Sequence, residues 1–244
     1  MRDLARRISA ARRLTIVTGA GVSSASGVPT FRGPQGLWKS FRPEDLATPH
    51  AFARDPRLVW EWYDWRRTRI AACQPNAAHE VIAEWSRRDG FTLITQNVDG
   101  LHERADTQHV VRYHGSIWNL RCATACAAAS SDWEDRTVPL AQLPPRCPHC
   151  GALARPGVVW FGEGIPESAA RAADAATACD VFLSIGTSSV VYPAAGLLYE
   201  AKRDGAFTAE INPESTAAAG VVDVAIAMPA EIALQELKRL MEIV

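Results

Sequence analysis

The stretch LTIVTGAGVSSASG, residues 14–27, is an apolar run followed by two closely spaced glycines. A glycine turn after a buried strand lets backbone N–H groups approach a pyrophosphate, and a helix beginning there would add its positive end. The third glycine of the dinucleotide-binding pattern is absent, since Ser24 stands in its place, and no acidic ribose partner is evident about 20 residues further on. Alone, the stretch indicates either a dinucleotide-binding turn or a glycine turn without a ligand.

Five further apolar runs follow along the chain. Continuous rather than alternating hydrophobicity is typical of parallel strands that are covered on both faces. Helical patterns lie between or after these runs, two of them with Pro166 and Pro229 in the first turn, and the alternation predicts a doubly wound, mostly parallel Rossmann-like α/β sheet. The expected strands are 14–18, 91–95, 110–113, 181–185, 207–211 and 222–227, and the expected helices are 76–88, 166–179, 194–203 and 229–243.

Two regions interrupt this alternation. Residues 28–75 are rich in Pro, Trp and Arg with a mostly helical pattern, and residues 116–160 hold four of the six cysteines. We expect these regions to form a smaller lobe from a helical insertion and a zinc ribbon. The nucleotide-binding domain would then comprise residues 1–27, 76–115 and 161–244, and the cleft between the two lobes is a favoured place for a ligand.

The composition excludes several classes of protein. The 244 residues are 48% hydrophobic and 22% charged with a net charge of −1, so no overall field favours nucleic acid or acidic membranes. No apolar run approaches the ~20 residues of a membrane span, and the N-terminus lacks a secretory signal. We expect a cytoplasmic monomer. The arginines of residues 2–13 are expected on the solvated face of a first helix; a binding arm is the alternative.

Four cysteines form two close pairs, Cys122 with Cys126 and Cys147 with Cys150. Spacings of roughly two to four residues within a pair and about 20 between pairs are typical of zinc sites. In a reducing compartment such grouping indicates metal rather than disulfides. Four thiolates leave no open coordination position, so we expect one structural Zn²⁺; four buried free thiols are the alternative.

The glycine-rich segment at residues 19–33 has the sequence GAGVSSASGVPTFRG. This sequence resembles the signature of the sirtuins, the NAD-dependent protein lysine deacylases. The resemblance covers nearly the whole chain. It continues in order through TQNVDGLH (95–102), HG (114–115), the four cysteines, RPGVVWFGE (155–163), GTS (186–188) and EIN (210–212).

The resemblance implies an NAD site. The glycine turn would hold the phosphates, residues after the strand 91–95 would face the nicotinamide and its ribose, and residues after the later strands would contact phosphates and ribose. Phe31 and Arg32 would lie on a loop over the cofactor. Because most of these residues follow expected strands, where ligands bind in such sheets, both arguments agree on the location. The cofactor-binding set is Gly19, Ala20, Gly21, Phe31, Arg32, Trp38, Gln96, Asn97, Asp99, Gly186, Thr187, Ser188, Asn212, Glu214 and Ala230.

By the same resemblance, His114 is the catalytic base. A neutral imidazole near physiological pH is able to act so, although a lone histidine is more often a structural hydrogen-bonding group. In the implied mechanism, the acyl-lysine carbonyl oxygen is held against the ribose carbon that bears nicotinamide. His114 then removes a proton from a ribose hydroxyl, and the products are nicotinamide, free lysine and O-acyl-ADP-ribose.

The expected helix 56–73 carries a candidate acyl selector. Tyr63 lies three residues before Arg66 and four before Arg67, so spacing alone allows either pair. The sirtuins that remove succinyl, malonyl and glutaryl groups have a Tyr-x-x-Arg pair here, which matches Tyr63 and Arg66, and Ala47 resembles their small pocket residue. A guanidinium can bind a distal carboxylate bidentately. The alternative is a solvated, arginine-rich helix face.

Residues 160–163 and 190–192 resemble the two segments between which the family binds its protein substrate as an added strand. Gly157 stands where many family members carry a bulkier polar residue, which leaves the peptide preference open. The substrate-binding set is Ala47, Tyr63, Arg66, Val159, Phe161, Gly162 and Val191.

Three other functions compete with this interpretation: a protein ADP-ribosyltransferase, an NAD-binding sensor without turnover, and an NAD-dependent dehydrogenase. The presence of His114, Asn97 and Asp99 argues against the sensor, and the missing third glycine argues against the dehydrogenase. We expect acylated lysines of proteins as partners, and neither nucleic acid nor a membrane.

Overall fold

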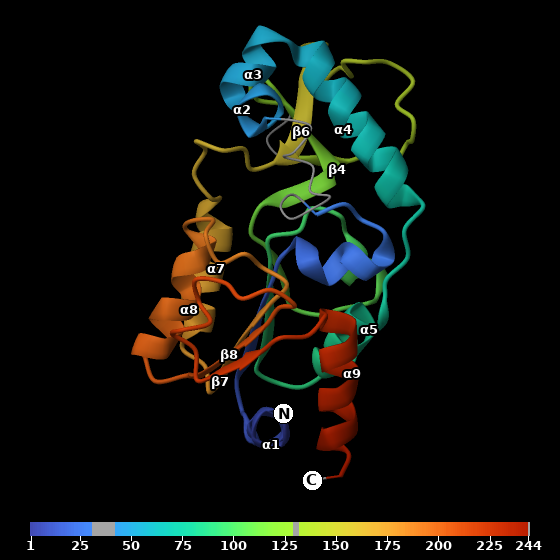
Figure 1. Ribbon diagram of the computed structural model, residues 1–244. Coiled ribbons are helices and arrows are strands. Elements are labelled where there is room, and N and C mark those ends of the chain that lie inside the picture. The colour runs from blue at the N-terminus through green and yellow to red at the C-terminus, as the bar shows by residue number, and fades with distance from the viewer. Residues whose placement is uncertain (31–41, 129–131, 244) are drawn as a thin grey trace.

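Six parallel strands form the large sheet in the order β3-β2-β1-β7-β8-β9 in the computed structural model, which describes residues 1–30, 42–128 and 132–243 (Figure 1). The strands are β1 (Leu14–Thr18), β2 (Phe91–Thr95), β3 (Val110–Arg112), β7 (Val181–Ile185), β8 (Phe207–Ile211) and β9 (Val224–Ile226). This confirms the doubly wound α/β fold. The strand order reverses between β1 and β7, and such switch points are where open parallel sheets bind ligands.

Strand β1 shows why the sequence folds into a covered sheet. All five of its residues are buried. Leu14 and Ile16 pack on one face of the sheet, and Val17 packs on the other. Because both faces are covered, an apolar residue is favoured at every position rather than at alternate ones.

Helices cover both faces of the large sheet. On one face lie α1 (Arg2–Ala10), α5 (Ala77–Trp85) and α9 (Ala230–Met241), and on the other lie α7 (Glu167–Thr177) and α8 (Ala194–Arg203) (Figure 1). The expected helices are confirmed. Pro166 and Pro229 are N-caps with extended backbone, ψ 132° and 145°, so each proline precedes the first turn instead of lying within it.

A smaller antiparallel sheet, in the order β5-β4-β6, lies with three further helices at one end of the molecule (Figure 1). The elements are β4 (Gly115–Cys122), β5 (Trp133–Glu134), β6 (Ala154–Val158), α2 (Pro43–Leu46), α3 (Pro49–Arg54) and α4 (Pro56–Ala71). They share one apolar core around Trp60, Leu120 and Val158. The short helix α6 (Leu101–Arg104) follows β2.

Helix α4 is fastened to the loop that follows β5. The fully buried Arg67 donates to the backbone carbonyls of Asp135 and Thr137, at 2.6 and 3.1 Å, and forms an ion pair with the Asp135 carboxylate. The Asp64 carboxylate accepts from the Leu140 N–H at 2.9 Å. These bonds fix the rotation of α4 about its axis, because Asp64 and Arg67 lie on one face of the helix.

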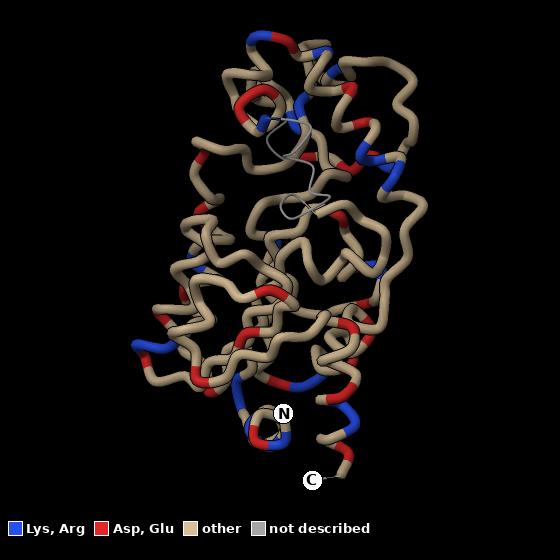
Figure 2. The backbone as a smooth tube through the Cα atoms, viewed as in Figure 1, with Lys and Arg blue, Asp and Glu red and all other residues tan. Residues whose placement is uncertain are grey.

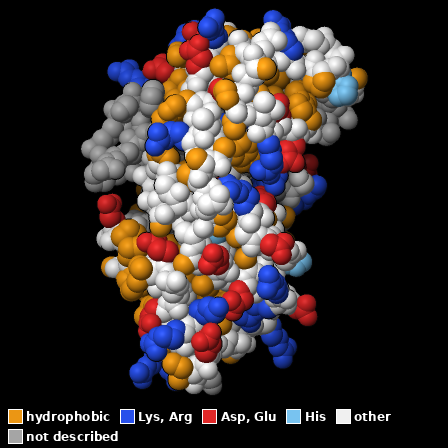
Figure 3. Space-filling view, turned by 90° about the vertical axis from the view of Figure 1, so that its right-hand side faces the viewer, with side chains coloured by type: hydrophobic (Ala, Val, Ile, Leu, Met, Phe, Trp, Pro, Cys, Tyr) orange, Lys and Arg blue, Asp and Glu red, His pale blue; other side chains and the backbone are white. Residues whose placement is uncertain are grey.

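Charged residues of both signs are interspersed along the chain (Figure 2), and the face in Figure 3 likewise mixes them. Within the described ranges, no helix has the length and apolar character needed to cross a membrane.

Candidate active site

A cavity of about 760 Å³ lies at the carboxyl ends of the parallel strands. Gly19, Gln96, Gly186 and Asn212, which directly follow β1, β2, β7 and β8, form part of its wall. Side chains of α4 and residues after β6 form the opposite part. The cavity therefore joins the switch point of the large sheet to the smaller sheet and its helices.

Most residues predicted from the sequence line this cavity. They are His114, Gly19, Ala20, Gly21, Gln96, Asn97, Gly186, Thr187, Ser188, Asn212, Glu214, Ala230, Ala47, Tyr63, Arg66, Val159, Phe161, Gly162 and Val191. Phe31, Arg32 and Trp38 lie outside the described residues. Among the predicted cofactor- and substrate-binding residues that the structure describes, Asp99 alone is away from the wall.

The glycine turn brings two backbones together. The Gly21 N–H donates to the Gly186 carbonyl at 2.8 Å, and a Cβ on Gly21 would lie 2.7 Å from the Gly186 Cα. A Cβ on Gly19 would lie 2.8 Å from the same carbonyl oxygen. The glycines thus permit close contact between the ends of β1 and β7. The chain continues as the 3₁₀ helix η1 (Ala20–Ser26), so the expected helix is short and tightly wound.

Asp99 lies behind the cavity wall and does not line the cavity. It is buried and accepts hydrogen bonds from the Ser23 hydroxyl at 2.8 Å and the Leu101 N–H at 2.9 Å. Asn97 donates to the Gly19 carbonyl at 3.0 Å and lies within 3.3 Å of the Ser23 hydroxyl. Burial raises the pKa of Asp99. Asp99 thus holds Ser23, which in turn contacts Asn97 in the wall.

His114 is the one histidine of the described chain that lines the cavity. Its Nδ1 lies 3.2 Å from the Gln96 carbonyl oxygen. A neutral ring that donates from Nδ1 leaves the Nε2 lone pair for a proton. Burial lowers the pKa of His114, and the Gln96 carbonyl opposes that shift. The neutral, proton-accepting form is therefore favoured.

The far end of the cavity is built from side chains of α4. Tyr63 and Arg66 are buried in its wall, whereas Arg67 faces the loop after β5. Of the two arginines that spacing allowed, Arg66 is thus the one beside the cavity. Burial raises the pKa of the Tyr63 hydroxyl and lowers that of Arg66. Tyr63 consequently keeps its proton at neutral pH.

Sequence reasoning missed Trp62, which lines the cavity beside Tyr63, and Ser23, which bonds Asn97 and Asp99 behind the wall. Trp62 lines the cavity and stacks edge-on against Tyr63, with ring centroids 4.8 Å apart. Its signal was available, because Trp62 lies four residues before Arg66 on the same helix. Ser23 had no such signal, since nothing local distinguishes it from Ser24.

The cavity rim carries exposed apolar side chains. Phe161, Val190 and Tyr192 are 45%, 50% and 70% exposed. The Phe161 N–H donates to the Ala47 carbonyl at 2.9 Å, which ties this rim to the small pocket residue. Behind it, Gly157 packs on β4 so closely that a Cβ would lie 2.7 Å from the Asn119 Cβ and 2.8 Å from its carbonyl oxygen.

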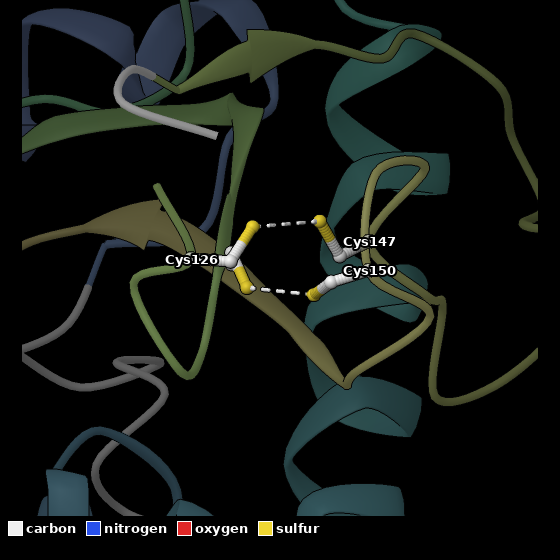
Figure 4. Close-up of side chains that lie close together, drawn as sticks. Cys126, Cys147 and Cys150 are labelled. Carbon is white, nitrogen blue, oxygen red and sulfur yellow. Dashed lines mark hydrogen bonds between the residues drawn. The ribbon is translucent and has the colours of Figure 1, made fainter. Parts of the chain in front are cut away.

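The four paired cysteines converge at the end of β4. Their sulfur atoms all lie within 4.8 Å of one another. Cys122 and Cys150 are 3.6 Å apart and Cys126 and Cys147 are 3.9 Å apart (Figure 4). A tetrahedral zinc with Zn–S bonds of about 2.3 Å needs sulfurs roughly 3.8 Å apart. The residues present therefore fit a closed, structural zinc site.

The Sir2 family profile matches residues 19–193, more than half of the chain. The chain belongs to the Sir2 family. A relative named "NAD-dependent protein deacylase" from Aquifex aeolicus is 50% identical over 212 residues, 86% of this chain and 87% of its own length. "NAD-dependent protein deacylase 1" from Pseudomonas aeruginosa is 51% identical over 220 residues, 88% of each chain.

Solved structures extend the likeness to the rest of this Sir2-family chain. A mutant Sir2 homologue in complex with ADP-ribose has a TM-score of 0.93 at 42% identity, covering 98% of this chain and 96% of its own. A Sir2 homologue–NAD complex has a TM-score of 0.91 at 42% identity, covering 99% and 94%. The strands and helices after residue 193 therefore also follow the Sir2 fold.

Proposed function

We propose that this Sir2-family chain, an NAD-dependent protein deacylase, removes succinyl and malonyl as well as acetyl groups from lysine side chains of proteins. The products are free lysine, nicotinamide and O-acyl-ADP-ribose. One observation carries the proposal: a single cavity joins the glycine turn, the His114 ring and the buried Tyr63–Arg66 pair. A cofactor end, a base and an acyl end thus share one space.

NAD fits the strand-end part of the cavity. There the glycines let two backbones approach, and a Cβ on Gly19 or Gly21 would overlap the chain after β7. Structural relatives are complexes with NAD and ADP-ribose. NAD supplies the ribose carbon that accepts the acyl oxygen. We assign its binding to the predicted set, with Asn97 in the wall and Asp99 behind it, and the resemblance adds Phe31, Arg32 and Trp38.

His114 is the proposed general base. Its Nδ1 is engaged by the Gln96 carbonyl, so Nε2 can accept a proton from a ribose hydroxyl. Val159 and Phe161 line the same cavity as His114.

Tyr63 and Arg66 are the proposed readers of the acyl chain. A buried guanidinium binds a carboxylate more strongly than an exposed one, because water competes less. An acetyl group offers no carboxylate to this pair. The acyl end therefore favours succinyl- and malonyl-lysine, and Ala47 leaves room for the longer chain.

The substrate peptide is proposed to lie along the exposed rim at Phe161, Gly162 and Val191. Structural relatives include Sir2Af2 bound to a myristoylated histone peptide, which supports a protein substrate. The four cysteines hold one structural zinc. The remaining cysteines, Cys73 and Cys179, form no disulfide, which supports a cytoplasmic location. We also propose that the protein is a monomer.

We also propose that residues 1–27, 76–115 and 161–244 form the NAD-binding domain, with residues 28–75 and 116–160 as insertions. Two of the three apolar clusters draw their buried residues from the remainder of the chain. The third is formed almost wholly by the two insertions, with Leu101 as a contribution from the larger part.

The decisive assay compares acetyl-, succinyl- and malonyl-lysine peptides of one sequence, each with NAD, by nicotinamide release. We expect higher kcat/KM for the two acidic acyl groups. Mass spectrometry should find O-acyl-ADP-ribose of matching mass. ADP-ribose attached to a protein acceptor would instead identify a transferase, and equal or lower activity on the acidic groups would contradict the acyl assignment.

A further inference from the structure

Trp160, which follows β6, contacts the acyl end through one hydrogen bond. Its indole Nε1–H donates to the Tyr63 hydroxyl oxygen at 3.0 Å, and each residue is only 3% exposed. The bond joins residues 97 positions apart. It lies in the wall of the same cavity as Arg66.

This bond decides what the Tyr63 hydroxyl can offer. An indole N–H is a donor only, so the Tyr63 oxygen must be the acceptor at this contact. A phenolic hydroxyl carries one proton and otherwise either donates or accepts. With one acceptor position filled by Trp160, the hydroxyl proton points elsewhere and is left for another acceptor. Burial also raises the pKa of Tyr63, so that proton is retained.

We propose that Trp160 is a specificity-determining positioning residue, which turns Tyr63 into a hydrogen-bond donor toward the distal carboxylate of an acidic acyl-lysine. The inference rests on the proposed function and deepens it. Arg66 has only donors, and Tyr63 set in this way adds another. Two donors side by side match a carboxylate, which has only acceptors when ionised.

The surroundings hold the indole in this orientation. The Arg155 guanidinium lies 3.6 Å from the centre of the Trp160 ring. Glu163 in turn holds Arg155 with two bonds of 2.6 and 2.8 Å and accepts the Trp160 backbone N–H at 2.8 Å. Phe52 packs against the ring, with centroids 5.3 Å apart. Rotation of the indole away from Tyr63 would break this stack.

The test variant is Trp160→Phe, which removes the N–H and keeps an aromatic ring over Arg155. We expect KM for a succinyl-lysine peptide to rise ~10-fold more than KM for the acetyl-lysine peptide, because one buried hydrogen bond is lost. Trp60→Phe is the matched control. It removes an indole bond of 2.8 Å, to the Ala154 carbonyl, from a fully buried tryptophan outside the cavity wall.

A double-mutant cycle separates positioning from general damage. Tyr63→Phe should raise the succinyl KM selectively, and adding Trp160→Phe to it should change the succinyl-to-acetyl KM ratio no further. An additive effect, or an equal KM rise on both substrates, would overturn the role of Trp160. Should Trp160→Phe not fold, an unchanged KM ratio in Tyr63→Phe would still refute it.

The proposed function fails separately. If the wild-type enzyme does not cleave succinyl-lysine, or if Arg66→Met affects both substrates equally, then the acyl assignment itself is wrong and Trp160 has no carboxylate to select. If Arg66→Met is selective but Trp160→Phe is not, only the role of Trp160 is overturned.

Discussion

The cavity is shaped by backbone contacts at one end and by side chains at the other. At the NAD end, Gly19 and Gly21 bring the chain after β1 against Gly186, and the contact is backbone to backbone. At the acyl end, Tyr63 and Arg66 line the cavity with their side chains. A wall of backbone is fixed by the fold, whereas a wall of side chains can change while the fold stays. Changes at the first end should therefore affect every substrate alike, and changes at the second should affect selectivity.

His114, where the two ends meet, should give the largest effect. His114→Ala is expected to fold, to keep its zinc and to lose ~1,000-fold in kcat on acetyl- and succinyl-lysine peptides alike, because a general base contributes on this order. Nicotinamide release measures the loss, and metal analysis checks the fold. His50→Ala, at an exposed position on α3, is the control. Near-normal turnover by His114→Ala would remove this residue from the chemistry.

Gly21→Ala should disrupt the NAD end of the cavity. The added Cβ meets backbone of Gly186 at 2.7 Å, which cannot move aside as a side chain would. We expect KM for NAD to rise roughly 100-fold, equally for all acyl groups, at the upper end of what forced overlap costs. Gly220→Ala is the control, since no atom lies within 4 Å of a Cβ at that position. A loss confined to succinyl-lysine would contradict the comparison.

Arg66→Met removes the guanidinium from the acyl end of the cavity. We expect kcat/KM for a succinyl-lysine peptide to fall roughly 30-fold, the effect of losing a charged hydrogen bond, and kcat/KM for the acetyl peptide to fall far less. Arg69→Met removes an exposed arginine from the same helix and should leave the ratio alone. Parallel losses on both peptides would show that Arg66 serves the fold instead of the carboxylate.

The smallest expected effect is on the pH profile. Burial lowers the pKa of His114 below its ordinary value of 6.5, so the neutral base persists below that pH. With an acetyl-lysine peptide, kcat/KM should fall only as pH drops through a midpoint under 6.5. His79 and His102 do not interfere, because burial lowers the pKa of each to about 3. A midpoint above 6.5 would show that His114 is not held in a desolvated site.

The large sheet could be predicted from the sequence because its strands are covered on both faces. The strands at 14–18, 91–95, 181–185 and 207–211 have the predicted ends. The strand predicted at 222–227 is shorter, Val224–Ile226, since the Val222 N–H instead donates to the Ala218 carbonyl in a turn. Strand β6 was not predicted, because Pro156 and Gly157 conceal its pattern.

The candidate site was predictable where it follows strand ends, since carboxyl ends of parallel strands meet at one edge. Contacts between distant segments were not predictable. The Ser23 hydroxyl donates to Asp99 across 76 positions, and no periodicity signals such a bond. The choice between Arg66 and Arg67 likewise depends on the rotation of α4, which is set by its bonds to Asp135 and Leu140.

Gly157 has a consequence for how the peptide preference can evolve. Any side chain there would overlap Asn119, and two of the three nearest atoms belong to its backbone, so trimming that residue alone would not make room. The spacing between β4 and β6 would have to widen first. Single substitutions at this position should therefore be lost under selection for activity, and a library that varies residue 157 alone should return glycine. A library that also varies the facing strand should yield variants with new peptide-sequence preferences.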